Sequence, residues 1–324
     1  MTYMNKIIAL AGPTAVGKTK FAIKLADEFD GEIVSCDSMQ LYKYMDIGSA
    51  KPTPEEMEQA RHHLVDMIDP REEFSVAEYQ RLAKQAISDI FSRGKLPVIS
   101  GGTGLYLNSL LYDMDFSAAP QDQAYRQELA EIAEKQGGDV LHSMLAEQDP
   151  QAAAAIHPNN RKKVIRALER LREGEGRVRP FSGIKNETKD YDVLLIGLTR
   201  ERAELYDRIN RRVDILVEQG LFDEVEKLRD MGLTAENISM KGIGYKEILD
   251  CFSGKYSRDE AIDTIKKNTR HYAKKQLTWF RRYYKMIWYN ISEFDNDDNA
   301  AGVIAAWVRK NLLDFTPRVT SLTT

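Results

Sequence analysis

The chain has 324 residues, a formal net charge of −4 and 43% hydrophobic residues, which suit one large or two medium globular domains and exclude a disordered chain. No run reaches the roughly 18 apolar residues of a membrane helix, and the N-terminus lacks the basic-then-apolar layout of a signal peptide. The two cysteines have no metal-ligand spacing, so we expect a reduced, cytoplasmic protein.

Short apolar runs alternate with helical patterns along much of the chain. Helices are predicted over residues 19–29 and 78–91, where apolar side chains recur at helical spacing. Strands are predicted at residues 6–11, 32–35, 96–100 and 193–198, with 64–66 as a candidate for another. This alternation predicts an α/β fold in which a parallel sheet carries helices on both faces.

The strand pattern stops between about residues 116 and 190. This stretch is helical and charged, with a loop-like part at 173–179. Because a strand is predicted again at 193, we expect a helical insertion domain (116–190) within an α/β core made of 1–115 and 191–324. From residue 201 the pattern is mostly helical, which gives the core a helical C-terminal part.

A phosphate-binding motif directly follows the first predicted strand. The segment Gly-Pro-Thr-Ala-Val-Gly-Lys-Thr at 12–19 matches G-x-x-x-x-G-K-[ST] and opens a predicted helix, as in P-loop NTPase-like folds. Its backbone amides, its lysine and the helix N-terminus can surround a diphosphate, and its last threonine can bind Mg²⁺. The predicted diphosphate-binding residues are Gly12, Pro13, Thr14, Ala15, Val16, Gly17, Lys18 and Thr19. Most such proteins hydrolyse a nucleoside triphosphate or transfer its terminal phosphoryl group, so the motif alone favours a kinase or NTPase.

Polar side chains also follow two other predicted strands. Asp37 lies at the carboxyl end of the second strand, where α/β sheets bind ligands, and can act as a general base or cap a turn. Ser38 and Gln40 add groups able to hydrogen-bond a base edge. Thr103 follows Gly-Gly after a later strand and either offers its hydroxyl at the same edge or caps the next helix.

Two segments, 161–179 and 266–285, are strongly basic on a chain that is acidic elsewhere. Either segment alone is typical of a solvated helix face. Because screening confines electrostatic attraction to roughly 8–10 Å, local charge matters more than net charge, and the two together favour an anionic polymer as partner.

The motifs together resemble one family. The segments G-P-T-A-x-G-K-T at 12–19, D-S-x-Q-x-Y-x-x-M-D-I-G-S-A-K-P at 37–52 and G-G-T-G-L-Y at 101–106 closely resemble tRNA dimethylallyltransferases (tRNA isopentenyltransferases). Further similar segments lie at 205–214, 220–225, 242–247 and 275–281, so the resemblance spans roughly residues 7 to 282 in order. It implies that the P-loop holds the diphosphate of dimethylallyl diphosphate, with Mg²⁺, instead of the end of an ATP.

The resemblance also assigns chemical roles. Asp37 would take a proton from N6 of the adenosine next to the anticodon on its 3′ side (position 37), and Thr103 would contact the bridging oxygen of the leaving group or orient the amine. Arg208 and Arg212 are either further diphosphate partners or surface arginines.

The same resemblance implies contacts with the anticodon stem-loop of tRNA. The flipped base would be held by Asp37, Ser38, Met39, Gln40 and Thr103. The stem-loop would contact Arg126, Arg161, Lys162, Lys163 and Arg166 of the insertion, and Lys267, Arg270 and Lys274 nearer the C-terminus. No obligate protein partner is expected. The alternatives are a P-loop kinase of a nucleotide or small molecule, an adenylate prenyltransferase, and a non-catalytic RNA-binding protein with a relic P-loop.

Overall fold

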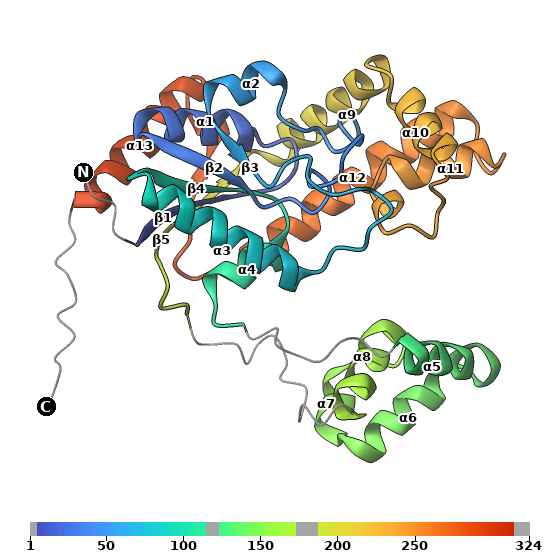
Figure 1. Cartoon of the computed structure of the whole chain (residues 1–324). Coiled ribbons are helices and arrows are strands. Elements are labelled where there is room, and N and C mark those ends of the chain that lie inside the picture. The colour runs from blue at the N-terminus through green and yellow to red at the C-terminus, as the bar shows by residue number, and fades with distance from the viewer. Residues whose placement is uncertain (1–4, 115–122, 173–186, 314–324) are drawn as a thin grey trace, which may run out of the picture. The chain divides into compact units, whose positions relative to one another are not determined.

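The computed structural model describes residues 5–114, 123–172 and 187–313, and its contacts divide the chain into two compact units. Unit 1 comprises Met1–Leu111 and Lys189–Thr324, and unit 2 comprises Tyr112–Thr188 (Figure 1).

Unit 1 is built on a six-stranded sheet in which every paired strand is parallel, in the order β3-β2-β4-β1-β5-β6. The strands are β1 (Lys6–Ala11), β2 (Gly31–Ser35), β3 (His62–His63), β4 (Leu96–Gly101), β5 (Asp192–Thr199) and β6 (Ile287–Asn290). All six residues of β1 are buried, because helices cover both faces of the sheet at its centre.

Helices lie on both faces of the sheet and at its carboxyl end. They are α1 (Lys18–Glu28), α2 (Pro54–Gln59), α3 (Val76–Ser92), α4 (Gly104–Leu111), α9 (Arg202–Glu218), α10 (Leu221–Asp230), α11 (Tyr245–Phe252), α12 (Arg258–Phe280) and α13 (Asp297–Leu313), with 3₁₀ turns η2 (Ser239–Lys241) and η3 (Ile291–Glu293). Figure 1 shows α1 and α13 on one face and α3 and α4 on the other, with α9 to α12 beyond the carboxyl ends of the strands. None of the helices in the described ranges is both long and apolar enough to cross a bilayer.

Capping explains why three of these helices begin where they do. Thr53, Ser75 and Ser257 each accept a hydrogen bond from the backbone amide three residues later, and a glutamate there bonds back to the capping residue. Such capping residues typically stabilise a helix by about 1 kcal/mol.

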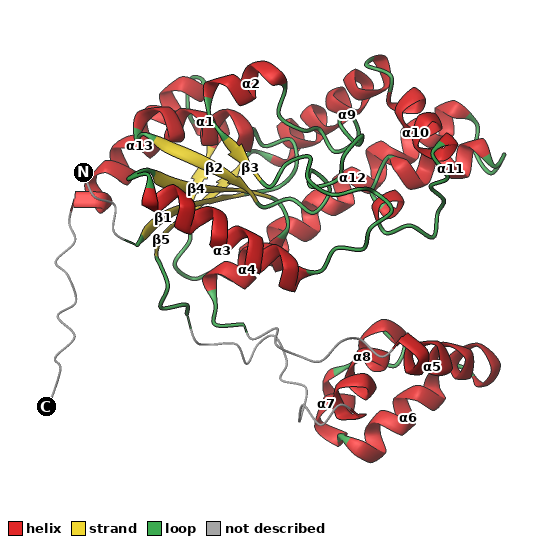
Figure 2. Cartoon of the chain, in the orientation of Figure 1, coloured by secondary structure: helices red, strands yellow, loops and turns green. Residues whose placement is uncertain are grey.

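The register brings three loops to one edge of the sheet. Ala11, the last residue of β1, pairs with Gly101 of β4 and Gly197 of β5, and Ser35 of β2 pairs with Ser100 of β4. The loops after β1, β2 and β4 therefore leave the sheet at nearly the same level. Figure 2 shows these loops between the strands and the helices α9 and α12.

The parallel sheet with helices on both faces confirms the predicted fold class, with two local differences. The candidate strand at 64–66 is wrong, because Leu64 and Asp66 have φ values of +61° and +58°, which no strand accommodates. The third strand lies just before them, at His62–His63. The pattern after residue 201 also gave no strand, whereas Ile287–Asn290 forms the edge strand β6.

Unit 2 is made of the helices α5 (Gln123–Gln136), α6 (Gly138–Gln148), α7 (Pro150–Ala155) and α8 (Arg161–Arg172). It has its own hydrophobic core, in which Leu129, Leu141, Leu145, Val164 and Leu168 are fully buried. The predicted loop at 173–179 lies outside the described residues.

Candidate active site

The turn between β1 and α1 has the backbone geometry of an anion cradle. Gly17, just before the helix, has a φ of +109°, which glycine adopts without steric cost. A Cβ at Gly12 would lie 2.7 Å from the Leu198 carbonyl oxygen, so the turn packs closely against β5 only with glycine there. The N-terminus of α1 and the turn's amides thus lie together at the carboxyl end of β1, where an anion is stabilised.

Lys18 holds its ammonium over the inside of this turn. Its Nζ donates to the carbonyl oxygens of Gly12 and Pro13 at 3.0 and 2.9 Å. Burial lowers the pKa of Lys18 to about 8, an effect that Asp37 opposes and Arg212 reinforces. The three charged side chains therefore lie near one another.

Arg208 and Arg212 of α9 face this region in different ways. The Nε of Arg208 donates to the Ala15 carbonyl oxygen at 3.0 Å, so Arg208 supports the backbone of the turn. Arg212 lines the cavity described below, and burial lowers its pKa while Asp37 opposes that change. Neither residue is a free surface arginine.

Asp37 and Thr103 lie in adjacent loops that are hydrogen-bonded to each other. The Thr103 amide donates to the Cys36 carbonyl oxygen at 3.1 Å, and Thr103 Oγ1 accepts the Ser38 amide at 3.0 Å. The Asp37 carboxylate caps its own turn through the Met39 amide, at 2.9 Å, and also lines the cavity. The turn-capping role and a position at the ligand site are thus compatible.

The glycines around Thr103 permit close approach of three different neighbours. A Cβ at Gly101 would lie 2.0 Å from the Cys36 carbonyl oxygen, and one at Gly102 would lie 2.3 Å from Gln276 Nε2. At Gly104 it would lie 2.3 Å from the Trp279 ring. The Gly-Gly-Thr-Gly segment is therefore specified by contacts with β2 on one side and α12 on the other.

Several of these groups line one cavity of about 760 Å³, although Thr103 and Arg208 are not among its lining residues. Its lining includes Thr14, Lys18 and Thr19 of the P-loop, together with Asp37 and Gln40. Further lining comes from Ile47, Ser49, Ala50, Lys51, Pro52, Arg212, Ile215, Leu216, Tyr272 and Gln276. The structure thus places a phosphate cradle, a carboxylate and apolar side chains around a single space.

Two residues of α12 complete the site, although their positions in the sequence predict no role for either of them. Gln276, 6% exposed, accepts the Thr14 amide at 2.8 Å and donates to the Gly102 carbonyl oxygen at 3.0 Å. Tyr272 lies beside Asp37 and Thr103, and burial raises its pKa to about 12, so its phenol stays protonated near neutral pH. The only sequence signal was their position in a basic helical segment that resembles the family.

The residues predicted to contact RNA are distributed over several elements. Ser38, Met39 and Gln40 lie in the loop after β2, next to Asp37. In unit 2 the four residues of α8 predicted to contact RNA are exposed, whereas Arg126 donates to the buried carboxylate of Glu169 at 3.0 Å. On α12, Lys267 and Lys274 are exposed, and Arg270 donates to Asn210 Oδ1 at 2.6 Å. These four residues of α8 are Arg161, Lys162, Lys163 and Arg166.

The site fits Mg²⁺ only as a partner of a bound diphosphate. The described residues contain no cluster of three or more His, Cys, Asp or Glu side chains that could hold a metal ion. Thr19, however, lines the cavity at the start of α1. Mg²⁺ commonly keeps several waters and binds through substrate phosphates and few protein groups, which agrees with this donor set.

Comparison with known proteins identifies the family. The family model described as IPP transferase matches residues 40–283. The chain belongs to this family. It is 51% identical over 300 residues to the tRNA dimethylallyltransferase of Alkaliphilus oremlandii, covering 93% of this chain and 96% of that protein. The corresponding protein of Acetivibrio thermocellus is 48% identical over 299 residues, covering 91% and 95%.

Solved structures of the family share the fold. The full-length tRNA isopentenylpyrophosphate transferase of Bacillus halodurans is 46% identical, with a TM-score of 0.72 and coverage of 95% of this chain and 97% of that one. A eukaryotic dimethylallyltransferase described as acting on tRNA is 29% identical, with a TM-score of 0.80 and coverage of 95% and 80%. Membership in a family of transferases agrees with a cavity that combines an anion cradle with a candidate base.

Proposed function

We propose that the chain transfers the dimethylallyl group of dimethylallyl diphosphate to N6 of the adenosine at position 37 of tRNA, adjacent to the anticodon on its 3′ side. The observation that carries this proposal is the cavity shared by Lys18 and Asp37. A leaving diphosphate and an activated nucleophile need their stabilising groups on opposite sides of one reacting carbon.

The P-loop side binds the leaving group. As the bond between the allylic carbon and oxygen breaks, its electron pair stays on the diphosphate, where the charge increases. The amides of the turn, the Lys18 ammonium and the Arg212 guanidinium stabilise that charge, and a preorganised donor typically contributes about 2.7–4 kcal/mol. Mg²⁺ bound through Thr19 and the diphosphate would neutralise more of it.

The Asp37 side activates the acceptor. The lone pair of an exocyclic amine is delocalised into the adenine ring, so the neutral amine is a poor nucleophile. Asp37 accepts the N6 proton while the bond between N6 and the allylic carbon forms, and such general-base catalysis typically contributes 10²- to 10⁴-fold. The hydroxyl of Thr103, which accepts the amide of Ser38 directly after Asp37, orients the amine or the bridging oxygen.

The adenosine has to leave the anticodon-loop stack to reach this cavity, which costs a few kcal/mol in general and less in a loop than in a duplex. Contacts of the RNA backbone with basic helices offset that cost. The side chains we assign to phosphates are Lys267 and Lys274 of α12, together with Arg161, Lys162, Lys163 and Arg166 of α8. Binding of tRNA should therefore weaken as salt rises, and more steeply than binding of the small diphosphate.

The test is direct. The chain is incubated with Mg²⁺, dimethylallyl diphosphate and unmodified tRNA that carries adenosine at position 37, and the RNA is digested to nucleosides for mass spectrometry. We expect dimethylallyl adenosine with the wild type and a loss of at least about 100-fold in rate with Asp37→Asn. Phosphoryl transfer from ATP without any adduct would instead establish a kinase, and prenylation of free AMP but not of tRNA would establish an adenylate prenyltransferase.

A further inference from the structure

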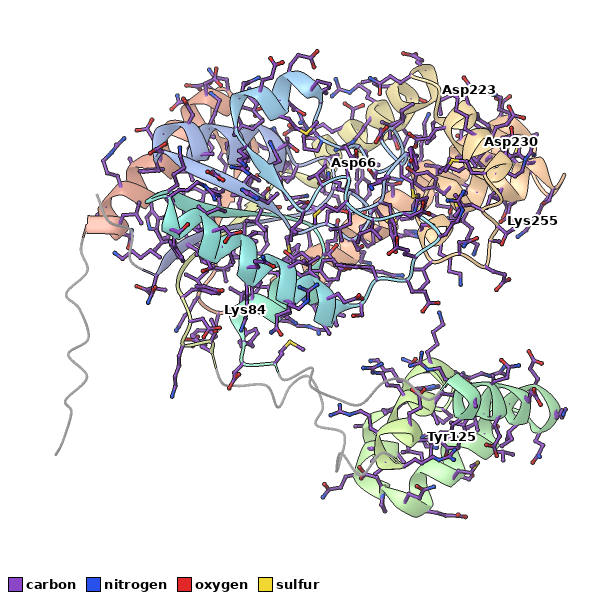
Figure 3. The ribbon with its side chains drawn as sticks, in the orientation of Figure 1. Asp66, Lys84, Tyr125, Asp223, Asp230 and Lys255 are labelled. Carbon is purple, nitrogen blue, oxygen red and sulfur yellow. The ribbon has the colours of Figure 1, made fainter. Side chains whose placement is uncertain are left out.

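A buried glutamate of α10 binds the loop that follows β2. Glu224, 8% exposed, accepts three consecutive backbone amides, those of Asp46 and Ile47 on Oε2 at 2.8 and 2.7 Å and that of Gly48 on Oε1 at 3.0 Å. Its Oε1 also accepts the hydroxyl of Tyr245 at 2.8 Å. In Figure 3 the labels Asp223 and Asp230 mark α10, which lies across the loops from the sheet.

The loop fits this carboxylate closely. A Cβ at Gly48 would lie 2.5 Å from the Tyr245 ring, so the backbone packs directly on that ring only with glycine there. Within the loop, the amide of Ala50 donates to Ile47 and the amide of Lys51 donates to Asp46, at 2.9 and 3.0 Å. The segment 46–51 is thus one compact turn in which three amides converge on a single carboxylate.

The same turn contacts a residue expected to hold the base. The side-chain amide of Gln40 donates to the Ala50 carbonyl oxygen at 3.1 Å, and its Oε1 accepts the Ser35 hydroxyl at 2.9 Å. Together the two bonds fix which end of the side-chain amide carries the nitrogen and which carries the oxygen. Gln40 therefore presents an oriented amide to the cavity only while Ala50 stays in place.

The turn also forms part of the cavity wall. Ile47, Ser49 and Ala50 line the cavity. Lys51 extends the wall through ion pairs with Asp46 and Asp66, at 2.5 and 2.7 Å. Glu224 does not line the cavity itself.

We infer that Glu224 is a positioning residue for the acceptor: it holds the turn 46–51 and, through Ala50, the side-chain amide of Gln40 that contacts the adenine. This rests on the proposed function. The donor cradle is built from residues 12–19, which Glu224 does not contact, so its loss should affect the tRNA side of the reaction and leave the diphosphate side unchanged.

The decisive variant is Glu224→Gln, which keeps the shape but places an NH₂ group against amide donors. Its matched control is Glu226→Gln, an exposed residue on the same helix. Tyr245→Phe removes only one of the four donors and is the milder variant if Glu224→Gln does not fold. The measurements are the KM for tRNA, the affinity for an anticodon stem-loop RNA, the affinity for dimethylallyl diphosphate, and hydrogen exchange at the amides of Asp46, Ile47 and Gly48.

With Glu224→Gln we expect faster exchange at those three amides and about tenfold weaker RNA affinity, with donor affinity unchanged. Combining Glu224→Gln with Gln40→Ala should lower RNA affinity no further than Gln40→Ala alone, because both act on one contact. Losses that multiply in the double variant, or an equal loss of donor affinity, would overturn the inference. A wild-type chain that makes no prenylated tRNA would refute the proposed function, while the RNA-affinity and exchange measurements would still decide the role of Glu224.

Discussion

Gln276 of α12 accepts a 2.8 Å hydrogen bond from the backbone amide of Thr14 in the P-loop, although the two residues lie 262 positions apart in the sequence. The other end of the same side chain donates to the Gly102 carbonyl oxygen. One buried amide thus fixes the distance between the diphosphate cradle and the loop that carries Thr103.

Replacing Gln276 should loosen both loops. Gln276→Leu removes the partner of the Thr14 amide and of the Gly102 carbonyl oxygen. Losing a partner typically costs about 1–3 kcal/mol for each group that stays buried. We expect lower thermal stability and about tenfold weaker binding of dimethylallyl diphosphate, measured by calorimetry. Thr278→Val, an exposed position on the same helix, is the control, and equal donor affinity in both variants would contradict the bridging role.

Donor affinity should depend on pH through Lys18. The anion binds the ammonium form, and the folded-state pKa of Lys18 is about 8. The attraction is therefore present below that pH and lost above it. At pH 9 only about one Lys18 in ten is charged, so donor affinity should be about tenfold weaker than at pH 7. The control is Lys18→Arg, whose side chain stays charged over this range. At each pH, the donor affinity of the wild type is divided by that of Lys18→Arg, which cancels the effect of the ligand's own titration.

Replacing Arg212 and replacing Arg208, both in α9, should affect different properties: the transfer rate and donor binding, respectively. Arg212 lines the cavity, whereas Arg208 supports the turn through the Ala15 carbonyl oxygen. Arg212→Gln should lower the transfer rate by at least about tenfold, since it removes a charge beside the leaving group. Arg208→Gln should mainly weaken donor binding. Arg211→Gln is the control, because Arg211 is exposed and paired with Asp207, and single-turnover rates distinguish the variants.

The ion pairs around the buried Glu32 should make the stability of the fold depend on pH. Burial alone would raise the pKa of Glu32, but hydrogen bonds from Arg93 and His63 outweigh it and lower the pKa from 4.5 to about 2. Because the folded state favours the ionised form, this stabilisation is present above pH 4.5 and lost as the pH falls towards 2. Glu32→Gln should lose about 3 kcal/mol at pH 7 in urea denaturation, and the two unfolding free energies should converge on acidification. The exposed Glu58→Gln should show neither effect.

The sequence was sufficient for the parts of the site that depend on strand ends. The P-loop, Asp37 and Thr103 each follow a strand of the same sheet, and parallel strands bring their carboxyl ends to one edge. Local spacing therefore predicted the loops that meet there. The sequence does not predict the backbone conformation of single residues. Leu64 is apolar, as many strand residues are, but its backbone is left-handed.

The helical contributions could not be derived in the same way. Gln276, Tyr272 and Glu224 act across packing contacts with loops far away in the sequence, and a polar residue on a helix carries no local sign of its partner. The edge strand Ile287–Asn290 is only four residues long and pairs on one side, so it has almost no periodic pattern to read.

The strand order has a consequence for how the enzyme is made. During synthesis the P-loop emerges before both strands that pair with β1, because β4 comes after β2 and β3, and β5 comes only after all of unit 2. Gln276, which accepts the Thr14 amide of the P-loop, is translated 262 positions after it. A nascent chain therefore contains the phosphate-binding sequence long before it has a complete cradle, and donor binding can stabilise the complete cradle only once α12 has been made.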